Sequence, residues 1–322
     1  MATSGSYDFS VNRDVLIKDA LVDMGVVGAE DTVSSAVNEH ASRQLNLMLK
    51  ALQSKGLRLW KARRATLLLQ QGTSSYSLGP SGDNFFLDSE LVETEVKVAI
   101  TGAGGSNVSI DVDDTTSMTA SDVIGIELDD GSMHFTTINA VTDSDTLVIT
   151  AGVPTGDTAA VDNNVYTYTT KAQRPLQILQ AFVRADDNTD RPIRIISRDE
   201  YYSYTDKFTS SEVTSIYYDP QLTSGVLYVW PPQQLTVNTL KLFVQYPFED
   251  MDAAANDFDF PQEWLMAVKY NLALVLCPSY GVQGTQLKTI AALAETYLDD
   301  AMSFDKEHVN IQLTPEYNWD AR

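Results

Sequence analysis

Apolar residues recur every three or four positions in the first 60 residues, as they do along one face of an amphipathic helix. A short helix that ends at Gly25 is predicted from Val15, Leu16, Ala20, Leu21 and Met24. A longer helix from about Ser35 to Lys55, followed by Gly56, is predicted from Val37, Ala41, Leu45, Met48 and Leu52. We expect both apolar stripes to pack in a core, and we assign them no chemistry.

From Ala65 to about Asp250 the apolar period changes to two, and short β-branched or aromatic runs alternate with Gly, Pro, Asp and Ser clusters. This region is therefore predicted to be mainly β-sheet. The expected strands cover residues 66–69, 91–100, 108–112, 146–150, 165–170, 193–196, 227–230 and 240–246. Residues 95–170 are rich in Gly, Ser, Thr and Asp, and we expect them to form a small inserted β-module.

A β-hairpin is the clearest local prediction in this module. Two alternating segments flank Asp130-Gly131, a dipeptide typical of two-residue hairpin turns. That turn would place Leu128 opposite Met133 and Ile126 opposite Phe135 on one face, with Glu127 opposite His134 on the other.

Helical patterns return near the C-terminus. Asp259 and Pro261 suit the start of a helix that runs to about Cys277 and stops at Pro278, and a second helix is predicted to begin near Thr285. Residues 309–322 have no helical period, and we expect an extended arm that adds a strand to a partner, with a frayed tail as the alternative. The arm's predicted partner-binding residues, for strand addition to a neighbour, are Val309, Ile311, Leu313, Tyr317 and Trp319.

These patterns predict an α+β protein with a helical bundle built from both ends and a β-rich middle domain that contains the inserted module. The expected domains are a discontinuous helical bundle (1–64 and 252–308), a β-rich domain (65–94 and 171–251), the β-module (95–170) and the arm (309–322).

Charge is distributed unevenly along the 322 residues, whose formal net charge is −22. Residues 1–64 hold 9 Lys and Arg against 7 Asp and Glu, which leaves the remainder at −24. An acidic surface repels DNA, whereas the basic cluster could face an acidic partner or one band of DNA, or could be a solvated helix end. The cluster consists of Lys55, Arg58, Lys61, Arg63 and Arg64. No apolar run approaches the roughly 20 residues of a membrane span, so we expect no membrane contact.

The candidates for chemistry are weak. The three histidines lie in different segments, and the single cysteine, Cys277, is expected to be a buried hydrophobe. Gly102–Gly105 is not followed by the Gly-Lys-Ser/Thr of a phosphate loop, and Asp111–Asp114 lacks the glycine and glutamate of a calcium loop. We therefore predict no catalytic residue, metal site or cofactor.

Several segments, in this order, resemble the head-to-tail adaptor (connector, tail tubular protein A-like) family of short-tailed bacteriophages. They cover most of the chain except residues 95–170. They are Leu21–Trp60 with its Gly25-Val26 break and closing Gly56-Leu57-Arg58-Leu59-Trp60, then Tyr217-Tyr218-Asp219-Pro220, Leu227-Tyr228-Val229-Trp230-Pro231-Pro232, and Phe260-Pro261-Gln262-Glu263-Trp264 leading to Tyr280-Gly281.

The resemblance implies a non-enzymatic virion protein at the head–tail interface, assembled in the host cytoplasm. It implies a ring of subunits, a dodecamer in relatives, between the portal protein and the tail nozzle protein, with genome DNA passing through the centre during ejection. An acidic channel wall suits this passage, because it lacks the affinity that basic grooves gain by releasing counterions from DNA. The inserted β-module departs from the shortest family members, and its role stays open.

Two other classes of function remain as alternatives. A carbohydrate-binding or receptor-binding tail protein predicts exposed aromatic platforms in the β-rich middle. A tail glycan hydrolase would need two carboxylates across a sugar, for which Asp199-Glu200 and Glu249-Asp250 are the acid pairs to consider.

Overall fold

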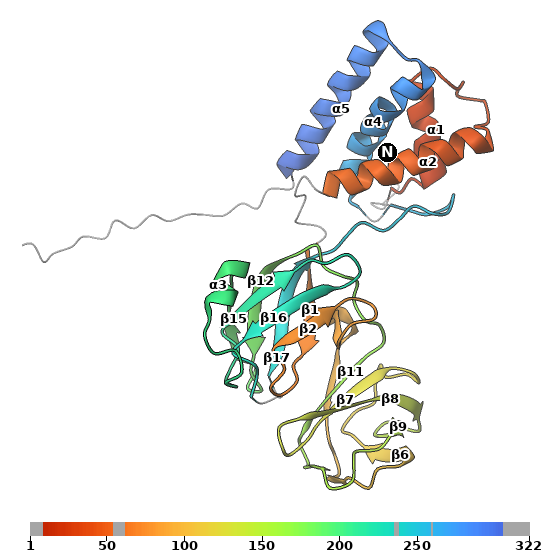
Figure 1. Cartoon of the computed structure of the whole chain (residues 1–322). Coiled ribbons are helices and arrows are strands. Elements are labelled where there is room, and N and C mark those ends of the chain that lie inside the picture. The colour runs from red at the N-terminus through yellow and green to blue at the C-terminus, as the bar shows by residue number, and fades with distance from the viewer. Residues whose placement is uncertain (1–8, 54–61, 235–237, 259, 305–322) are drawn as a thin grey trace, which may run out of the picture. The chain divides into compact units, whose positions relative to one another are not determined.

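The computed structural model describes residues 9–53, 62–234, 238–258 and 260–304. The protein is of the mixed α+β type, with helices and mainly antiparallel sheets, as predicted (Figure 1). It divides into two compact units. The helical unit comprises Met1–Lys61 with Phe248–Arg322, and the β unit comprises Ala62–Pro247. The sequence had placed the corresponding boundaries at 64/65 and 251/252.

The described part of the helical unit contains four α-helices: α1 (Arg13–Asp23), α2 (Ser35–Gln53), α4 (Leu265–Leu276) and α5 (Gly284–Phe304). Helix α4 contacts each of the other three, and α1 also contacts α2. Ten of the twelve α4 residues are apolar or aromatic, and an α-helix that is apolar on nearly all sides must be surrounded. Helices from both ends of the chain therefore share one hydrophobic core, which includes Leu21, Leu45, Trp264 and Leu272.

The two polar residues of α4 are each bound to a neighbouring helix. The Lys269 ammonium lies 2.9 Å from the Asp23 carboxylate of α1. The Asn271 side-chain amide donates to the carbonyl oxygen of Ala267 in its own helix, at 2.8 Å, and to that of Ala294 in α5, at 3.3 Å. Because both polar groups have partners, α4 can be enclosed without leaving them unsatisfied.

The helix ends agree with the sequence where the structure describes them. Asn12 caps α1 by accepting a hydrogen bond from the Val15 amide at 3.0 Å, and Gly25 follows with a φ of 69°. Helix α4 stops at Leu276, and the 3₁₀ turn η3 (Cys277–Tyr280) contains Pro278. Another 3₁₀ turn, η2 (Gln262–Trp264), precedes α4. Gly56 and Asp259 lie outside the described residues.

Two sheets of the β unit enclose a common core. The five-stranded sheet has the order β13-β12-β17-β1-β3, and the four-stranded sheet has the order β14-β15-β16-β2. Leu67, Val183 and Leu242 from the first sheet pack with Tyr76, Ile216 and Leu227 from the second. The strand bounds are β1 (Ala62–Leu68), β2 (Ser75–Leu78), β3 (Phe85–Leu87), β12 (Gln177–Arg184), β13 (Asp190–Pro192), β14 (Arg194–Ile195), β15 (Ser215–Asp219), β16 (Gly225–Trp230) and β17 (Thr239–Gln245), with α3 (Arg198–Ser203) between β14 and β15.

A third sheet, with the order β4-β11-β7-β8-β9-β6, has its own core around Ile126, Ile149 and Val165. It starts at Val92, three residues before the predicted insert, because β4 pairs with β11. The expected strand over 91–100 is in fact two strands, β4 and β5. The bounds are β4 (Val92–Glu95), β6 (Ser106–Asp111), β7 (Val123–Glu127), β8 (Met133–Val141), β9 (Thr146–Ala151) and β11 (Asn164–Tyr168), and a separate pair is formed by β5 (Ile100–Thr101) and β10 (Thr158–Ala159).

The predicted register of the β7–β8 hairpin was wrong by one residue. Ile126 lies opposite His134, and Glu127 lies opposite Met133. The turn has three residues rather than two, because the Leu128 amide bonds to the Ser132 carbonyl and Gly131 adopts a φ of 81°. A one-residue change reverses the face on which each partner lies. Glu127 also accepts hydrogen bonds from Asn164 of β11, the strand that pairs with the other edge of β7.

The shared helical core leads to a stability prediction on α2. Leu45 is fully buried, whereas Leu47, two residues along the same helix, is 64% exposed. We expect Leu45→Ala to lower the free energy of unfolding by about 2–5 kcal/mol, because it leaves a cavity. We expect the control Leu47→Ala to change it by less than about 0.5 kcal/mol. Denaturant unfolding followed by far-UV circular dichroism measures both, and equal losses would contradict the packing described.

Candidate functional site

The structure describes two of the predicted site residues. Arg63 and Arg64 lie in β1, so they belong to a strand of the β unit and not to a helix end. The other members of the basic cluster, Lys55, Arg58 and Lys61, lie outside the described residues, as do the arm residues Val309, Ile311, Leu313, Tyr317 and Trp319.

Arg64 is neutralised within its own sheet. Its guanidinium forms an ion pair with Asp88, the residue that follows β3. Arg63 forms no ion pair with any residue that the structure describes, and both arginines are exposed. They line an open cavity of about 480 Å³ together with Leu87, Asp88, Ser89 and Phe243. Of the two basic side chains, only Arg63 therefore offers an uncompensated charge to a partner.

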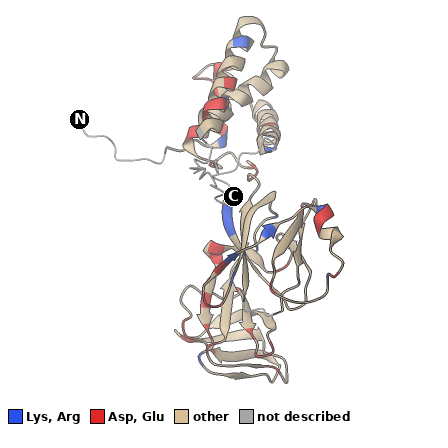
Figure 2. Cartoon of the chain, turned by 90° about the vertical axis from the view of Figure 1, so that its left-hand side faces the viewer, with Lys and Arg blue, Asp and Glu red and all other residues tan. Residues whose placement is uncertain are grey.

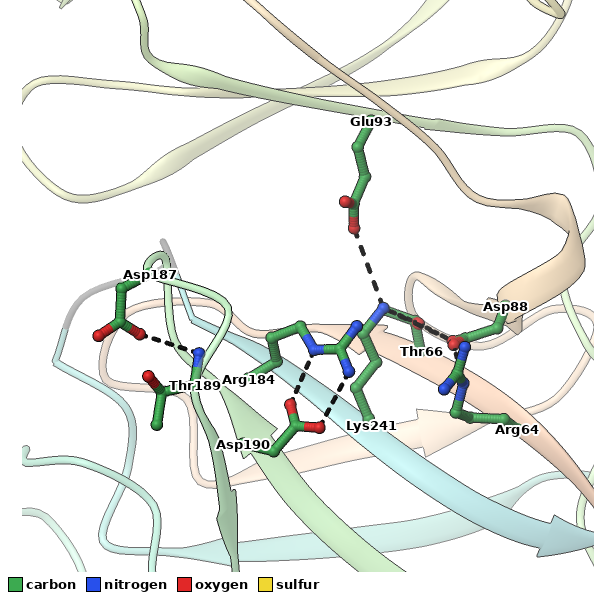
Figure 3. Close-up of polar contacts among 9 residues, drawn as sticks. All are labelled: Arg64, Thr66, Asp88, Glu93, Arg184, Asp187, Thr189, Asp190 and Lys241. Carbon is green, nitrogen blue, oxygen red and sulfur yellow. Dashed lines mark hydrogen bonds and ion pairs between the residues drawn. The ribbon is translucent and has the colours of Figure 1, made fainter.

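A buried lysine lies beside this ion pair (Figure 3). Lys241 of β17 is only 1% exposed, and its ammonium donates a hydrogen bond to the Thr66 hydroxyl at 2.9 Å. Thr66 is its direct neighbour on β1 and in turn donates to Asp88. The carboxylates of Asp88 and Glu93 lie 3.6 Å and 4.0 Å from the ammonium. Two carboxylates and a hydroxyl thus surround a charge that would otherwise be unpaired in the protein interior.

The environment of Lys241 moves its pKa downward. Burial disfavours the charged form and is the largest influence, whereas the negative charges of Asp88 and Glu93 act in the opposite direction. Since Asp88 follows β3 and Glu93 lies in β4, these contacts connect the five-stranded sheet with the first strand of the third sheet. Phe86 and Tyr168 reinforce the same junction, with stacked rings whose centroids are 4.1 Å apart.

An arginine–carboxylate pair extends the polar network across the sheet (Figure 3). Arg184 of β12 binds Asp190 of β13 through two parallel hydrogen bonds of 2.8 Å and 3.0 Å. This bidentate contact lowers the pKa of Asp190 and raises that of Arg184. In the turn between these strands, the Thr189 amide donates to Asp187 and lowers the pKa of that carboxyl group. The network therefore fixes the edge hairpin β12–β13.

An acidic cavity of about 420 Å³ adjoins the network. Its carboxylates come from Glu93, Glu95, Asp162 and Asp186, and Arg184 is its basic side chain. In the described residues, no group of three or more His, Cys, Asp and Glu side chains has a geometry that would hold a metal ion. Figure 2 shows that acidic segments occur in both units.

The two acid pairs considered for sugar chemistry occupy surface positions. Asp199 and Glu200 form the first turn of α3, where the Ser197 hydroxyl accepts from the Glu200 amide, and Glu200 pairs with Arg194 at 3.1 Å. Asp250 of the second pair lies 2.7 Å from the Lys50 ammonium. Each of these two carboxylates is thus held by a local basic side chain.

The structure also locates the remaining candidates. Cys277 is fully buried, as predicted, and burial raises the pKa of its thiol. The His134 ring lies 3.0 Å from the Ala151 carbonyl oxygen, to which it can donate, and the His40 ring lies 3.4 Å from the Ser279 hydroxyl. Gly102–Gly105 is a loop between β5 and β6, and no helix begins there.

Sequence reasoning missed the Lys241 network. The one available signal was a lysine between Leu240 and Leu242 in a strand of otherwise apolar or uncharged residues. Alternation places Leu240, Leu242 and Val244 on the core face, and hence Lys241 on the opposite face. Its partners Thr66, Asp88 and Glu93 are some 150 residues or more away in the chain, so only the strand pairing brings them together.

Comparison with known proteins gave no match, either to models of protein families or among curated protein sequences. Among the helices that the structure describes, none has both the length and the apolar character to cross a membrane.

The buried lysine gives a pH prediction. Between its lowered pKa and the ordinary lysine value, the unfolded chain binds more protons than the folded protein, so the free energy of unfolding rises with pH. We expect Lys241→Met to remove this rise in the free energy of unfolding at alkaline pH. The tyrosines titrate in both proteins, so the difference between the two curves of unfolding free energy against pH reports on Lys241 alone. Leaving a buried charge without its partner costs about 3–5 kcal/mol. Because Arg64 still pairs with Asp88 in the variant, we expect the free energy of unfolding at neutral pH to fall by less than this. Parallel pH curves from denaturant titrations would contradict this account.

Proposed function

We propose that this protein is a non-enzymatic subunit of a ring that joins the portal to the tail nozzle of a short-tailed bacteriophage. In this proposal the genome passes through the centre of the ring. The order of sequence segments shared with the head-to-tail adaptor family supports it. Tyr217–Asp219 and Leu227–Trp230 lie in the paired strands β15 and β16, and Trp264, which directly precedes α4, is buried in the core of the helical unit.

The observation that carries the proposal is that helices from the N-terminal and C-terminal parts of the chain share one hydrophobic core. The β unit leaves this helical unit after Lys61 and returns to it at Phe248. A helical bundle built from both ends can be repeated around a ring as an assembly element, while the β unit remains available for other contacts. We assign subunit assembly to the helical ends on this basis.

Exposed apolar side chains on the helices suit such assembly. Val15 of α1, Leu47 of α2, and Met266 and Val275 of α4 are between 39% and 64% exposed. Single exposed apolar residues are common on monomers, but α4 is apolar on nearly all sides and its core partners cover only part of it. A second copy of the chain would remove this remaining apolar surface from water.

The acidic charge suits a channel for DNA. With a net charge of −22, the protein is not expected to offer a broad basic surface that binds DNA phosphates and releases their counterions. DNA can therefore pass without being held. Arg63, whose charge is uncompensated in the described part of the chain, is proposed to face an acidic surface of a partner protein.

If the helical unit forms the subunit interface, a Leu→Glu substitution there should weaken subunit association, whereas the same substitution in the β unit should not. Leu47→Glu on α2 places a charge in the proposed subunit interface, where burial without a partner is costly, and we expect subunit association to weaken at least about tenfold. Leu222→Glu, at a 96% exposed position of the β unit, serves as the matched control and should leave association unchanged. Sedimentation velocity measures both. The opposite order of effects would overturn the assignment.

The role proposed for the arm predicts a loss of portal binding when the arm is removed. We expect deletion of residues 309–322 to abolish binding to the portal, because it removes Val309, Ile311 and Leu313, whose alternation suits strand addition. The free energy of unfolding should stay the same, which shows that the shortened chain still folds. Co-sedimentation with purified portal is the measurement, and unchanged assembly onto portals would rule out the role proposed for the arm.

A further inference from the structure

A cluster of tyrosines covers the outer face of the four-stranded sheet. Tyr217 of β15 and Tyr228 of β16 are cross-strand neighbours with nearly parallel rings, whose centroids are 5.6 Å apart at an interplanar angle of 11°. Tyr201 of α3 packs on both, at 6.0 Å and 5.1 Å. The three rings form one aromatic cluster, in which Tyr201 is buried and Tyr217 and Tyr228 are partly exposed.

Other aromatic residues enlarge this surface, which we call the tyrosine face. Tyr202 is 54% exposed and meets the ring of Tyr201 edge-on at 5.5 Å. Tyr204 stacks on Trp230 at 4.1 Å, and the Trp230 indole N–H donates to the Asp206 carbonyl at 2.7 Å. The Trp230 ring is therefore fixed by its stacking partner and by the loop after α3.

Two basic side chains of the tyrosine face have no carboxylate partner in the described part of the protein. The Arg198 guanidinium lies over the Tyr202 ring at 5.8 Å. The Lys207 ammonium lies 5.5 Å from the centre of the Tyr201 ring and donates to the Tyr204 carbonyl at 2.7 Å. Both cations thus rest on aromatic rings, which attract them without neutralising them.

In the described part of the chain, none of the acidic groups nearby forms an ion pair with Arg198 or Lys207. Glu200 pairs with Arg194 at 3.1 Å. Asp206 accepts hydrogen bonds from the Phe208 and Thr209 amides, and Asp219 accepts one from the Gln221 side chain at 3.0 Å. Asp199 is an exposed residue in the first turn of α3. Arg198 and Lys207, which form no ion pair in the described part of the chain, keep N–H donors available for an anionic ligand.

We propose that the tyrosine face binds an acidic glycan, a saccharide of pyranose rings that carry carboxylate groups. Aromatic rings contact the apolar C–H faces of a pyranose, and the tyrosine hydroxyls exchange hydrogen bonds with its hydroxyl groups. Arg198 and Lys207 supply charged donors for the carboxylates, and the guanidinium can bind one through two hydrogen bonds. The exposed or partly exposed tyrosine rings, with their hydroxyls, suit a polyhydroxylated ligand better than the apolar anchor of a protein interface, which fills a dry pocket.

The ionisation state of the tyrosines fits this role. Burial is the main cause that raises the pKa of Tyr201, Tyr217 and Tyr228 above the ordinary tyrosine value. The hydroxyls therefore remain protonated at neutral pH and can donate as well as accept hydrogen bonds. The negative charge of distant parts of the protein is screened beyond about 8 Å at physiological ionic strength.

The test is calorimetric titration of the full-length protein with soluble oligosaccharides. Trigalacturonate, oligoalginate and oligosialate are the acidic probes, and maltotriose is the neutral one. We expect at least one acidic probe to bind more tightly than maltotriose. Arg198→Gln and Tyr202→Ala should each weaken that binding about tenfold. Arg43→Gln, which removes the same charge from α2, and Val98→Ala, at an equally exposed position, are controls that should bind normally.

Two outcomes would overturn the glycan proposal. One is that no acidic probe binds better than maltotriose, or that the Arg198 and Tyr202 variants bind as tightly as the controls. The other is that these two variants change the mass of the assembled ring or its portal complex and leave saccharide binding intact, which would make the tyrosine face a protein interface. Ring assembly is measured separately, so failure of the glycan proposal leaves the adaptor proposal standing.

Discussion

Burial of helix α4 is the constraint on which the rest of the structure depends. With apolar residues on nearly every side, α4 must be largely covered, and the helices that pack against it come from both the N-terminal and the C-terminal part of the chain. The N-terminal helices therefore cannot form this core alone. Residues 62–247 form a separate unit that is inserted between the two parts of the helical unit. The ion pair Lys269–Asp23 and the Asn271–Ala294 hydrogen bond fix the helices at the two polar positions of α4.

Charged side chains have different roles in the two units. In the helical unit, an ion pair links two helices at the edge of the apolar core. In the β unit the charge is partly buried, since Lys241, Thr66 and Asp88 lie on the outer side of the five-stranded sheet, where Glu93 of the third sheet approaches. Such a network stabilises the junction only while every member keeps a partner. The tyrosine face differs again, because its two cations are left on aromatic rings and remain available to a ligand.

Periodicity predicted the elements whose residues alternate regularly. Leu240, Leu242 and Val244 marked β17, and Leu45 and Leu52 marked α2. Strand β12 was missed because a bulge between Ile178 and Gln180 breaks its period of two, and the β7–β8 register failed because the turn has one more residue than Asp130-Gly131 suggests. The Lys241 network could not be predicted, since strand pairing assembles it from residues far apart in the chain. The tyrosine face was missed because it depends on β15 and α3, neither of which was predicted. Most of the predicted site residues, including the whole arm, lie outside the described residues.

The central proposal, a ring that binds the portal, is tested most directly by native mass spectrometry of the purified full-length protein, alone and mixed with portal. One chain has a mass of 35.5 kDa. The account predicts a closed oligomer, near twelve chains if it follows the adaptor family, that forms on its own or on the portal and remains bound to it. A protein that stays at 35.5 kDa under both conditions and ignores the portal would contradict it.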